Sequence, residues 1–190
     1  MIVLASQSPR RLELLLQMGI HPEVVPVKVD ETPAGDEAPE AYVRRVTQDK
    51  ARAGAALRPH QPVLAADTAV ILDQRIMGKP KHQADAARML LRLSGRTHQV
   101  LSGVALWHEQ VLRYRLNRSL VRFRQIAESE AQAYWANGEP RDKAGGYAVQ
   151  GRGALFIERI CGSYSGIMGL PLFETGELLR QAGLRLGPDR

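Results

Sequence analysis

The sequence predicts an α/β fold in which helices cover the faces of a mixed β-sheet. In the first part of the chain, short apolar runs alternate with helical patterns, as they do in strand–helix units. Later, two long stretches rich in β-branched residues, Thr97–Trp107 and Val111–Phe123, flank the polar turn His108-Glu109-Gln110. Such a pair predicts an antiparallel hairpin. Strand–helix units together with a hairpin predict a sheet with both parallel and antiparallel strands.

The N-terminal elements follow from apolar runs and helix-end signals. Ile2–Ala5 is an apolar run that predicts a buried strand. Ser8-Pro9 supplies an N-cap and a proline at the first helical position, so a helix is expected from there to Gly19. Glu23–Val29 is predicted to be extended. After a loop containing proline and glycine, a helix is expected over Glu40–Leu57.

The remaining elements are predicted from the same periodicities. They are a strand Val63–Ala66 continued by Ala69–Leu72, a helix Gln83–Leu93, a helix Glu128–Asn137, a strand Leu155–Ile160 and a helix Phe173–Ala182. The glycine-rich segments Gly145-Gly146 and Gly151-Arg152-Gly153 match no phosphate-binding fingerprint, so they are interpreted as turns.

Length and composition are those of an ordinary globular domain. The 190 residues, of which 44% are hydrophobic and 24% charged, predict one domain over residues 1–184 and a loose tail over 185–190. We find no signal-peptide pattern and no apolar run long enough for a membrane span. Cys161 is the single cysteine and is expected to be a buried, inert thiol. A cytoplasmic protein is therefore expected.

The formal net charge of +6 raises the question of an anionic partner. Aromatic residues make up only 5% of the chain and the basic residues are spread along it, which does not favour nucleic-acid binding. A basic band in the predicted hairpin is interpreted as the solvated face of a strand; it consists of Arg113, Arg115, Arg118, Arg122 and Arg124. The five histidines lack metal-ligand spacing, so no structural zinc site is expected.

Two cations lie in the first turn of the first predicted helix. Arg10 and Arg11 stand where the backbone amides already present positive partial charge, so their placement is unfavourable unless an anion binds there. Free amides, the Ser8 hydroxyl and two guanidinium groups would form a phosphate site. The alternative is that both arginines simply face water.

Lys50 lies close to the apolar stripe of the helix over Glu40–Leu57, which Tyr42 and Val46 help to define. A cation in that position needs a partner, unless its ammonium group reaches solvent at the edge of the stripe. Lys79, in a loop before Pro80, is uninformative by itself.

Two carboxylates follow predicted strands. Asp67 ends the run Val63–Ala66, and Glu31 follows an extended segment. Ligands of open α/β sheets collect at the carboxyl ends of strands, so Asp67 and the Ser8 region are expected to face one crevice. Such carboxylates can hold Mg²⁺ together with substrate phosphates, or activate a water as a general base. The alternative for each is a turn or cap residue.

Taken in order, these residues belong to motifs that resemble the Maf family of nucleoside triphosphate pyrophosphatases from Met1 to about Leu184. The motifs are Leu4-Ala5-Ser6-Gln7-Ser8-Pro9-Arg10-Arg11, Asp30-Glu31-Thr32, Lys50-Ala51, Ala66-Asp67-Thr68, Gly78-Lys79-Pro80, Leu93-Ser94-Gly95-Arg96-Thr97-His98, Asp142-Lys143-Ala144-Gly145-Gly146-Tyr147 and Gly169-Leu170-Pro171. The resemblance implies an elongated fold with two lobes around a deep nucleotide-binding cleft, and a homodimer.

The resemblance also implies roles for individual residues. Asp67 matches the catalytic acidic residue and Glu31 its acidic partner, and the two would hold a divalent cation, Mg²⁺ or Mn²⁺. The residues that match the phosphate-contacting set are Ser8, Arg10, Arg11, Lys50 and Lys79. Arg10, Thr68 and Gln150 resemble the base-specificity pattern of the branch that acts on dTTP and UTP.

The expected activity is hydrolysis of a nucleoside triphosphate to its monophosphate and pyrophosphate. The expected substrates are dTTP and UTP, while CTP and modified pyrimidine nucleotides stay open, and the expected role is house-cleaning of nucleotide pools. The alternative is a non-catalytic basic regulator of septum formation that binds nucleic acid or a division protein. A regulator of that kind would not need Asp67 or Glu31.

Overall fold

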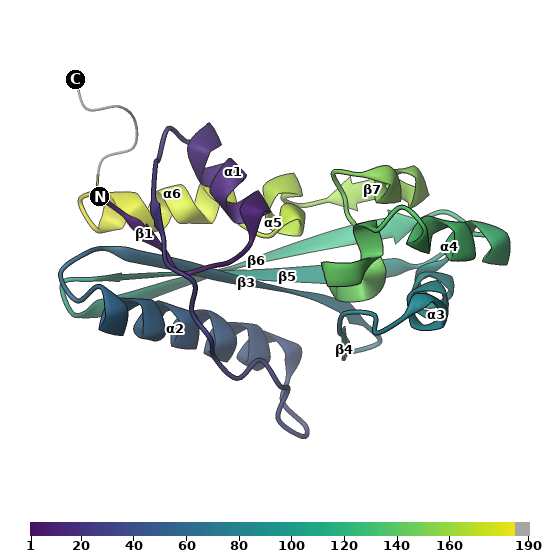
Figure 1. Cartoon of the computed structure of the whole chain (residues 1–190), viewed down its shortest axis with the longest axis horizontal. Helices are drawn as coiled ribbons and strands as arrows, with labels where there is room; N and C mark the ends of the chain where they lie inside the picture. The colour runs from purple at the N-terminus through teal and green to yellow at the C-terminus, as the bar shows by residue number, and fades with distance from the viewer. Residues whose placement is uncertain (185–190) are drawn as a thin grey trace.

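The computed structural model describes residues 1–184, which form one mixed sheet with helices on both faces (Figure 1). The strands are β1 Val3–Leu4, β2 Glu23–Val24, β3 Val63–Leu72, β4 Arg75–Met77, β5 Thr97–His108, β6 Val111–Phe123 and β7 Ile157–Cys161. Their order is β2-β1-β3-β5-β6-β7, with β4 paired to β3. β1 runs parallel to β2 and β3, and the other pairs are antiparallel. The predicted mixed sheet and its β5–β6 hairpin are confirmed.

The helices divide between the two faces and one end of the sheet. They are α1 Pro9–Gln17, α2 Pro39–Leu57, α3 Gln83–Leu93, α4 Glu128–Trp135, α5 Tyr164–Met168 and α6 Leu172–Gln181, with 3₁₀ segments η1 Glu139–Asp142, η2 Ala144–Gly146 and η3 Arg152–Phe156. In Figure 1, α2 lies along one face, α1, α5 and α6 lie on the other, and α3 and α4 gather at the far end beside β4 and β7.

Alternation along β3 explains how one strand serves both faces, because successive side chains of a strand point to opposite sides. Val63 and Ala65 pack with the small residues of α2, whereas Leu64 and Ala66 pack with leucines of α1 and α6. We call the part of the molecule that contains these two cores, together with α1, α2 and α6, the α2 lobe. Farther along, Val70 belongs to a separate core that α3, α4 and the 3₁₀ segments surround, which we call the α3 lobe. The predicted elongated, two-lobed fold is therefore observed.

α2 approaches the sheet unusually closely at Gly103 of β5. A Cβ atom on Gly103 would lie 2.5 Å from Oγ1 of Thr47 and 2.9 Å from Cγ1 of Val43, so only glycine fits beneath the helix. Gly103 pairs with Asp67 across the β3–β5 ladder. The absence of a side chain at Gly103 thus brings α2 close to the position of Asp67.

The structure corrects several sequence-based expectations. Cys161 is exposed, not buried, because β7 is an edge strand of the sheet and the side chains along it are mostly open. β2 ends at Val24, after which Val25 still donates to Leu4 O and the chain then leaves the sheet. β4 and α5 were not predicted. The predicted tail over 185–190 lies outside the described residues.

The basic band on β6 mostly faces solvent, as expected. Three of its arginines form ion pairs: Arg118 with Glu40, Arg122 with Glu158, and Arg124, just after β6, with Glu130. Within residues 1–184, no helix is both long and apolar enough to cross a membrane.

Candidate functional site

The candidate site lies at a gap in the sheet beside β3. On the side of β3 away from β5, Val63 and Leu64 pair with β1, while Val70–Leu72 pair with β4. The intervening residues 65–69 have no strand partner on that side among the described residues. Asp67 and Thr68 lie in this gap and, because side chains alternate, point to opposite faces of the sheet. Both therefore border the same opening from different sides.

A cleft of 1040 Å³ occupies this gap, between the α2 lobe and the α3 lobe. All nine side chains that the sequence singled out line it: Ser8, Arg10, Arg11, Glu31, Lys50, Asp67, Thr68, Lys79 and Gln150. They come from six separate parts of the chain, so the fold gathers them at the expected crevice. Their chemical roles stay predictions.

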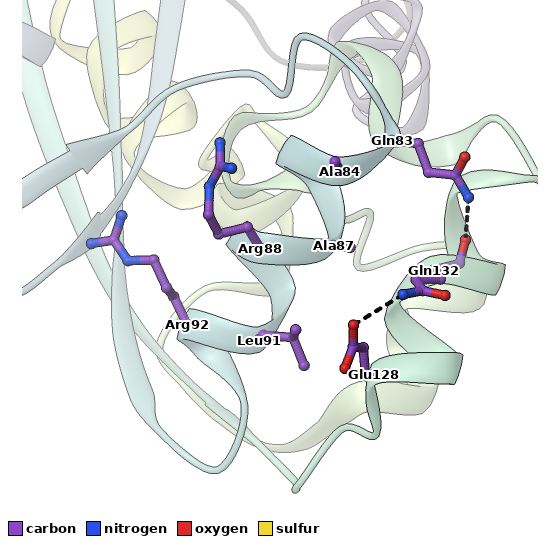
Figure 2. A pocket seen from close by; sticks show the side chains of 8 residues that line it. All are labelled: Gln83, Ala84, Ala87, Arg88, Leu91, Arg92, Glu128 and Gln132. Carbon is purple, nitrogen blue, oxygen red and sulfur yellow. Dashed lines mark hydrogen bonds between the residues drawn. The ribbon is translucent and has the colours of Figure 1, made fainter.

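A second hollow of 740 Å³ lies between α3 and α4 (Figure 2). Gln83 on α3 and Glu128 on α4 each hydrogen-bond to Gln132, and most of the lining side chains are exposed. None of the nine predicted residues lines this hollow. The cleft beside β3 is therefore the candidate functional site.

Lys50 joins the two predicted catalytic carboxylates. Its Nζ lies 2.8 Å from Oδ1 of Asp67 and 2.8 Å from Oε1 of Glu31. Lys50 is 7% exposed and Asp67 is 6% exposed, so the lysine does not extend to solvent and the predicted partner of this cation is present. The hydrogen bond and charge of Lys50 outweigh the opposing effect of burial and lower the pKa of Glu31 below its ordinary value. Among residues 1–184, Lys50 is the one side chain that hydrogen-bonds or ion-pairs with these two carboxylates.

Helix α1 directs Arg10 and Arg11 into the cleft beside α5. Arg11 donates through Nε to Gly169 O at 2.9 Å and through Nη1 to Ser6 Oγ at 3.0 Å. Arg10 donates through Nε to Met168 O at 3.4 Å. The hydroxyl of Ser8, the N-cap, makes no capping hydrogen bond within residues 1–184. These contacts hold the arginines in the wall of the cleft, which does not support the alternative that both merely face bulk water.

The cleft carries an excess of positive charge. Six lysines and arginines line it, against three carboxylates: Arg10, Arg11, Lys28, Lys50, Lys79 and Lys143 against Glu31, Asp67 and Asp142. Burial lowers the pKa of Arg11, although the charge of Asp67 opposes the shift. Burial and the nearby charge of Arg10 lower the pKa of Lys143. Cations whose protonated form is disfavoured in this way are stabilised when an anion binds beside them.

The carboxylate pair is a suitable donor set for a divalent cation. Oδ1 of Asp67 and Oε1 of Glu31 both contact one nitrogen, so the two side chains converge. Within the described part of the chain, Oδ2 of Asp67 and Oε2 of Glu31 make no hydrogen bond, and no cluster of three or more His, Cys, Asp or Glu occurs. Mg²⁺ is typically held by one or two carboxylates plus substrate phosphates and water, which this pair can satisfy.

Thr68 and Gln150 lie at another part of the same cleft. Oγ1 of Thr68 lies 2.8 Å from Oγ of Ser102, its neighbour across the β3–β5 ladder. Gln150 is exposed, but the backbone on both sides of it is anchored. Ala148 N donates to Oη of Tyr134, and Arg152 N donates to Oε1 of Glu139 at 2.8 Å.

Sequence reasoning missed three residues that help to form the site. Lys143 and Tyr147 line the cleft, and both lie in the motif over 142–147, which could have identified them. Ser102 carried no signal, because only the pairing of β3 with β5 places it beside Thr68.

Residues 1–182 match the family of Maf-like proteins. The chain belongs to the Maf family. Among its curated Maf relatives, a dTTP/UTP pyrophosphatase from Methylococcus capsulatus is 54% identical over 184 residues, covering 96% of this chain and 91% of that protein. A dTTP/UTP pyrophosphatase from Nitrosomonas europaea is 50% identical over 197 residues, covering 96% of this chain and 95% of that protein.

Among solved structures, this Maf protein is similar to the Ham1 protein of Staphylococcus aureus. The two are 17% identical with a TM-score of 0.49, and the match covers 93% of this chain and 98% of that one.

Proposed function

We propose that this Maf protein hydrolyses dTTP and UTP to the corresponding monophosphate and pyrophosphate, as part of house-cleaning of nucleotide pools. The observation that carries this proposal is that one cleft contains both the Lys50-linked carboxylate pair and an excess of cationic side chains. The name dTTP/UTP pyrophosphatase, carried by relatives that are about half identical over nearly the full chain, supports the choice of substrate.

Charge balance assigns the triphosphate to the cationic wall of the cleft. Hydrolysis of a phosphoanhydride depends mainly on positioning and on neutralising charge that develops on oxygen. We place the phosphates against Ser8, Arg10, Arg11 and Lys79, where guanidinium forks can bind phosphate oxygens in pairs. The leaving pyrophosphate gains charge when the bond from the α-phosphorus to the bridging oxygen breaks, and these cations stabilise it.

Asp67 is the proposed general base. Its Oδ1 is held by Lys50, which leaves Oδ2 able to accept a proton from water as the water oxygen bonds to the α-phosphorus. Lys50 contacts both Asp67 and Glu31 and holds them converged, so the lysine positions both carboxylates. With Asp67 and Glu31 as its protein ligands, a Mg²⁺ or Mn²⁺ ion would neutralise phosphate charge and polarise water.

Base recognition is assigned to Thr68, Gln150 and Arg10. A uracil or thymine edge carries carbonyl acceptors on either side of one N–H donor. The amide NH₂ of Gln150 can donate to one of these carbonyls, which leaves the central N–H to pair with the hydroxyl of Thr68. A site that hydrogen-bonds one base edge leaves its groups unpaired when another base enters, which gives strong discrimination.

Product analysis tests the proposed function. Purified protein is incubated with dTTP or UTP and Mg²⁺ or Mn²⁺, and the products are separated. We expect monophosphate and pyrophosphate in equal amounts, and no activity after chelation of the metal. Diphosphate and orthophosphate as products, or no hydrolysis of either nucleotide under any of these conditions, would contradict the proposal.

A homodimer is also proposed on the basis of the resemblance, and a cytoplasmic location on the basis of the sequence pattern and the single cysteine. Light scattering after size exclusion tests the first, because the chain mass is 21.0 kDa. A species of that mass over a wide concentration range would exclude the dimer. No observation favours the alternative of a non-catalytic regulator of septum formation.

A further inference from the structure

Three groups form a hydrogen-bonded chain that runs from the cleft into the protein. Thr68 lines the cleft, and its Oγ1 lies 2.8 Å from Oγ of Ser102. Ser102 is 1% exposed and does not line the cleft. Its Oγ lies 2.6 Å from the backbone oxygen of Gly166, in α5. The three groups connect β3, β5 and α5.

The direction of these hydrogen bonds follows from the number of protons. The backbone oxygen of Gly166 can only accept, and the Ser102 hydroxyl has one proton, so Ser102 donates that proton to Gly166. Ser102 can then only accept from Thr68, and Thr68 must donate. The single proton of the Thr68 hydroxyl is therefore used in its hydrogen bond to Ser102. Thr68 therefore presents only lone pairs to the cleft.

We propose that Ser102 sets the base selectivity of the cleft by fixing the Thr68 hydroxyl as a hydrogen-bond acceptor toward the bound base. This inference rests on the proposed function, in which Thr68 contacts the base. Uracil and thymine present an N–H at the middle of their pairing edge, which matches an acceptor. Cytosine presents an unprotonated nitrogen there, so two lone pairs would face each other. Ser102 is thus a positioning residue that acts through Thr68.

The proposal predicts a specific pattern among the nucleotides. Guanine has an N–H at the equivalent position of its edge, whereas adenine, like cytosine, has an unprotonated nitrogen. In the Ser102→Ala variant the Thr68 hydroxyl is free to rotate, so it can donate as well as accept. Binding and hydrolysis of nucleotides with cytosine or adenine should then improve, while those of uracil nucleotides should change little. A change in pocket size alone would not separate the nucleotides in this way.

The test compares dUTP with dCTP, which differ only in the atoms of the pairing edge. We expect parent protein to favour dUTP in kcat/KM, and Ser102→Ala to reduce that ratio at least about tenfold, mainly by improving dCTP. Thr68→Val should reduce the ratio by weakening dUTP instead. Ser119→Ala is the matched control, because Ser119 is also 1% exposed and hydrogen-bonds to Ser163 at the start of α5, whereas its hydrogen bonds within residues 1–184 do not include Thr68.

Calorimetric binding of non-hydrolysable dUTP and dCTP analogues provides a second readout that needs no turnover. An unchanged dUTP to dCTP ratio in Ser102→Ala, or a parent that prefers dCTP, would overturn the proposal. If parent protein cleaves neither dTTP nor UTP, the proposed function fails, and the binding ratios in parent, Ser102→Ala and Thr68→Val still decide the role of Ser102. If Ser102→Ala does not fold, Thr68→Val decides it, since equal ratios in that variant and the parent contradict the acceptor role.

Discussion

Lys50 shows how a single residue gives the cleft its chemical character. Its ammonium group contacts Asp67 and Glu31 at 2.8 Å each, while almost no solvent reaches it. Two carboxylates brought this close would repel one another, and a cation between them removes the repulsion. The sequence indicated that Lys50 needed a partner, from its position near an apolar stripe. It could not indicate that Lys50 has two carboxylate partners, because Glu31 and Asp67 lie far apart along the chain.

The first prediction concerns Asp67. Asp67→Asn should fold normally but lose at least about 10²-fold in kcat for dTTP, because an amide cannot accept the proton from water or ligate a metal as a carboxylate does. Initial rates of pyrophosphate release, with circular dichroism to check folding, measure this. Asp142→Asn is the matched control, since Asp142 is a carboxylate that also lines the cleft. Equal losses in both variants would show that only the total charge of the cleft matters.

The second prediction concerns Gln150. Gln150→Ala should flatten the preference for dTTP and UTP over CTP, ATP and GTP, with a smaller effect on the best rate, because it removes recognition but leaves Asp67 and Lys50 in place. Measurement of kcat/KM for the five nucleotides checks this. A variant with unchanged ratios would show that Gln150 does not read the base.

His98 behaves as a pH-sensitive residue of the α3 lobe. It is 2% exposed, its Nε2 lies 2.7 Å from Oη of Tyr147, and its Nδ1 makes no hydrogen bond within residues 1–184. Burial lowers the pKa of His98 to about 4. Between that value and the ordinary value of about 6.5, the unfolded chain binds more protons than the folded one. The contribution of His98 to the free energy of unfolding should therefore be complete above about pH 6.5 and be lost as the pH drops toward 4.

The third prediction follows from this pKa shift. The contribution of His98 to the pH dependence is up to about 3 kcal/mol, and His98→Gln should remove it. Urea unfolding of parent and variant between pH 7 and pH 4 measures the difference in slope. His21→Gln, at an exposed histidine, is the control for the histidine-to-glutamine change itself. A slope that His98→Gln leaves unchanged would contradict the assignment.

Cys161 illustrates why burial of one residue is hard to predict. A lone cysteine is usually buried, and the strand Leu155–Ile160 was expected to end just before Cys161. The structure instead starts β7 at Ile157 and places it at the edge of the sheet, where Cys161 pairs with the exposed Leu120. Edge position depends on the order of strands, which periodicity does not contain.

At the scale of elements, long periodic segments were predicted well and short ones were not. The helix α2 and the β5–β6 hairpin agree with expectation because each has many residues of one period. The helix α5 has five residues and β4 has three, too few to show a period. Both nevertheless contribute to the site: carbonyls at the C-terminal end of α5 accept from Arg10 and Arg11, and β4 borders the gap in the sheet.

The segment over 148–153 positions Gln150 through a carboxylate outside the cleft. Glu139 accepts from Oη of Tyr134 at 2.7 Å, from Arg152 N at 2.8 Å and from Gly153 N at 3.2 Å. A Cβ atom on Gly151 would lie 2.5 Å from this carboxylate, so a larger residue there would displace the carboxylate from the amides that donate to it. The sequence showed these glycines as a turn, but it could not show what the turn encloses.

The fourth prediction tests this element. Glu139→Gln should loosen the segment, because an amide nitrogen in place of one oxygen cannot accept a hydrogen bond. We expect faster hydrogen exchange at the amides of Arg152 and Gly153, by about tenfold or more. Glu130→Gln is the matched control, since Glu130 accepts from Ala127 N and from Arg124 but does not touch this segment. Equal exchange in both variants would contradict the anchoring role.

At the scale of the whole molecule, the site exists because the sheet is interrupted. β1 and β4 flank a stretch of β3 that has no partner on one side within residues 1–184, and the two lobes meet across that gap. The α2 lobe supplies Lys50, and the α3 lobe supplies the segment that carries Gln150. The chain order of the motifs predicted that these residues belong together. The gap itself depends on strand pairing, which the sequence alone did not reveal.

Hydrolysis of dTTP in water enriched in oxygen-18 locates the phosphorus atom that water attacks. If water attacks the α-phosphorus with Asp67 as the base, the label should enter the thymidine monophosphate and be absent from pyrophosphate. Mass spectrometry of both products measures the label. Asp67→Asn should form labelled thymidine monophosphate much more slowly than the parent protein. Label in the pyrophosphate, or undiminished labelling by Asp67→Asn, would contradict the account.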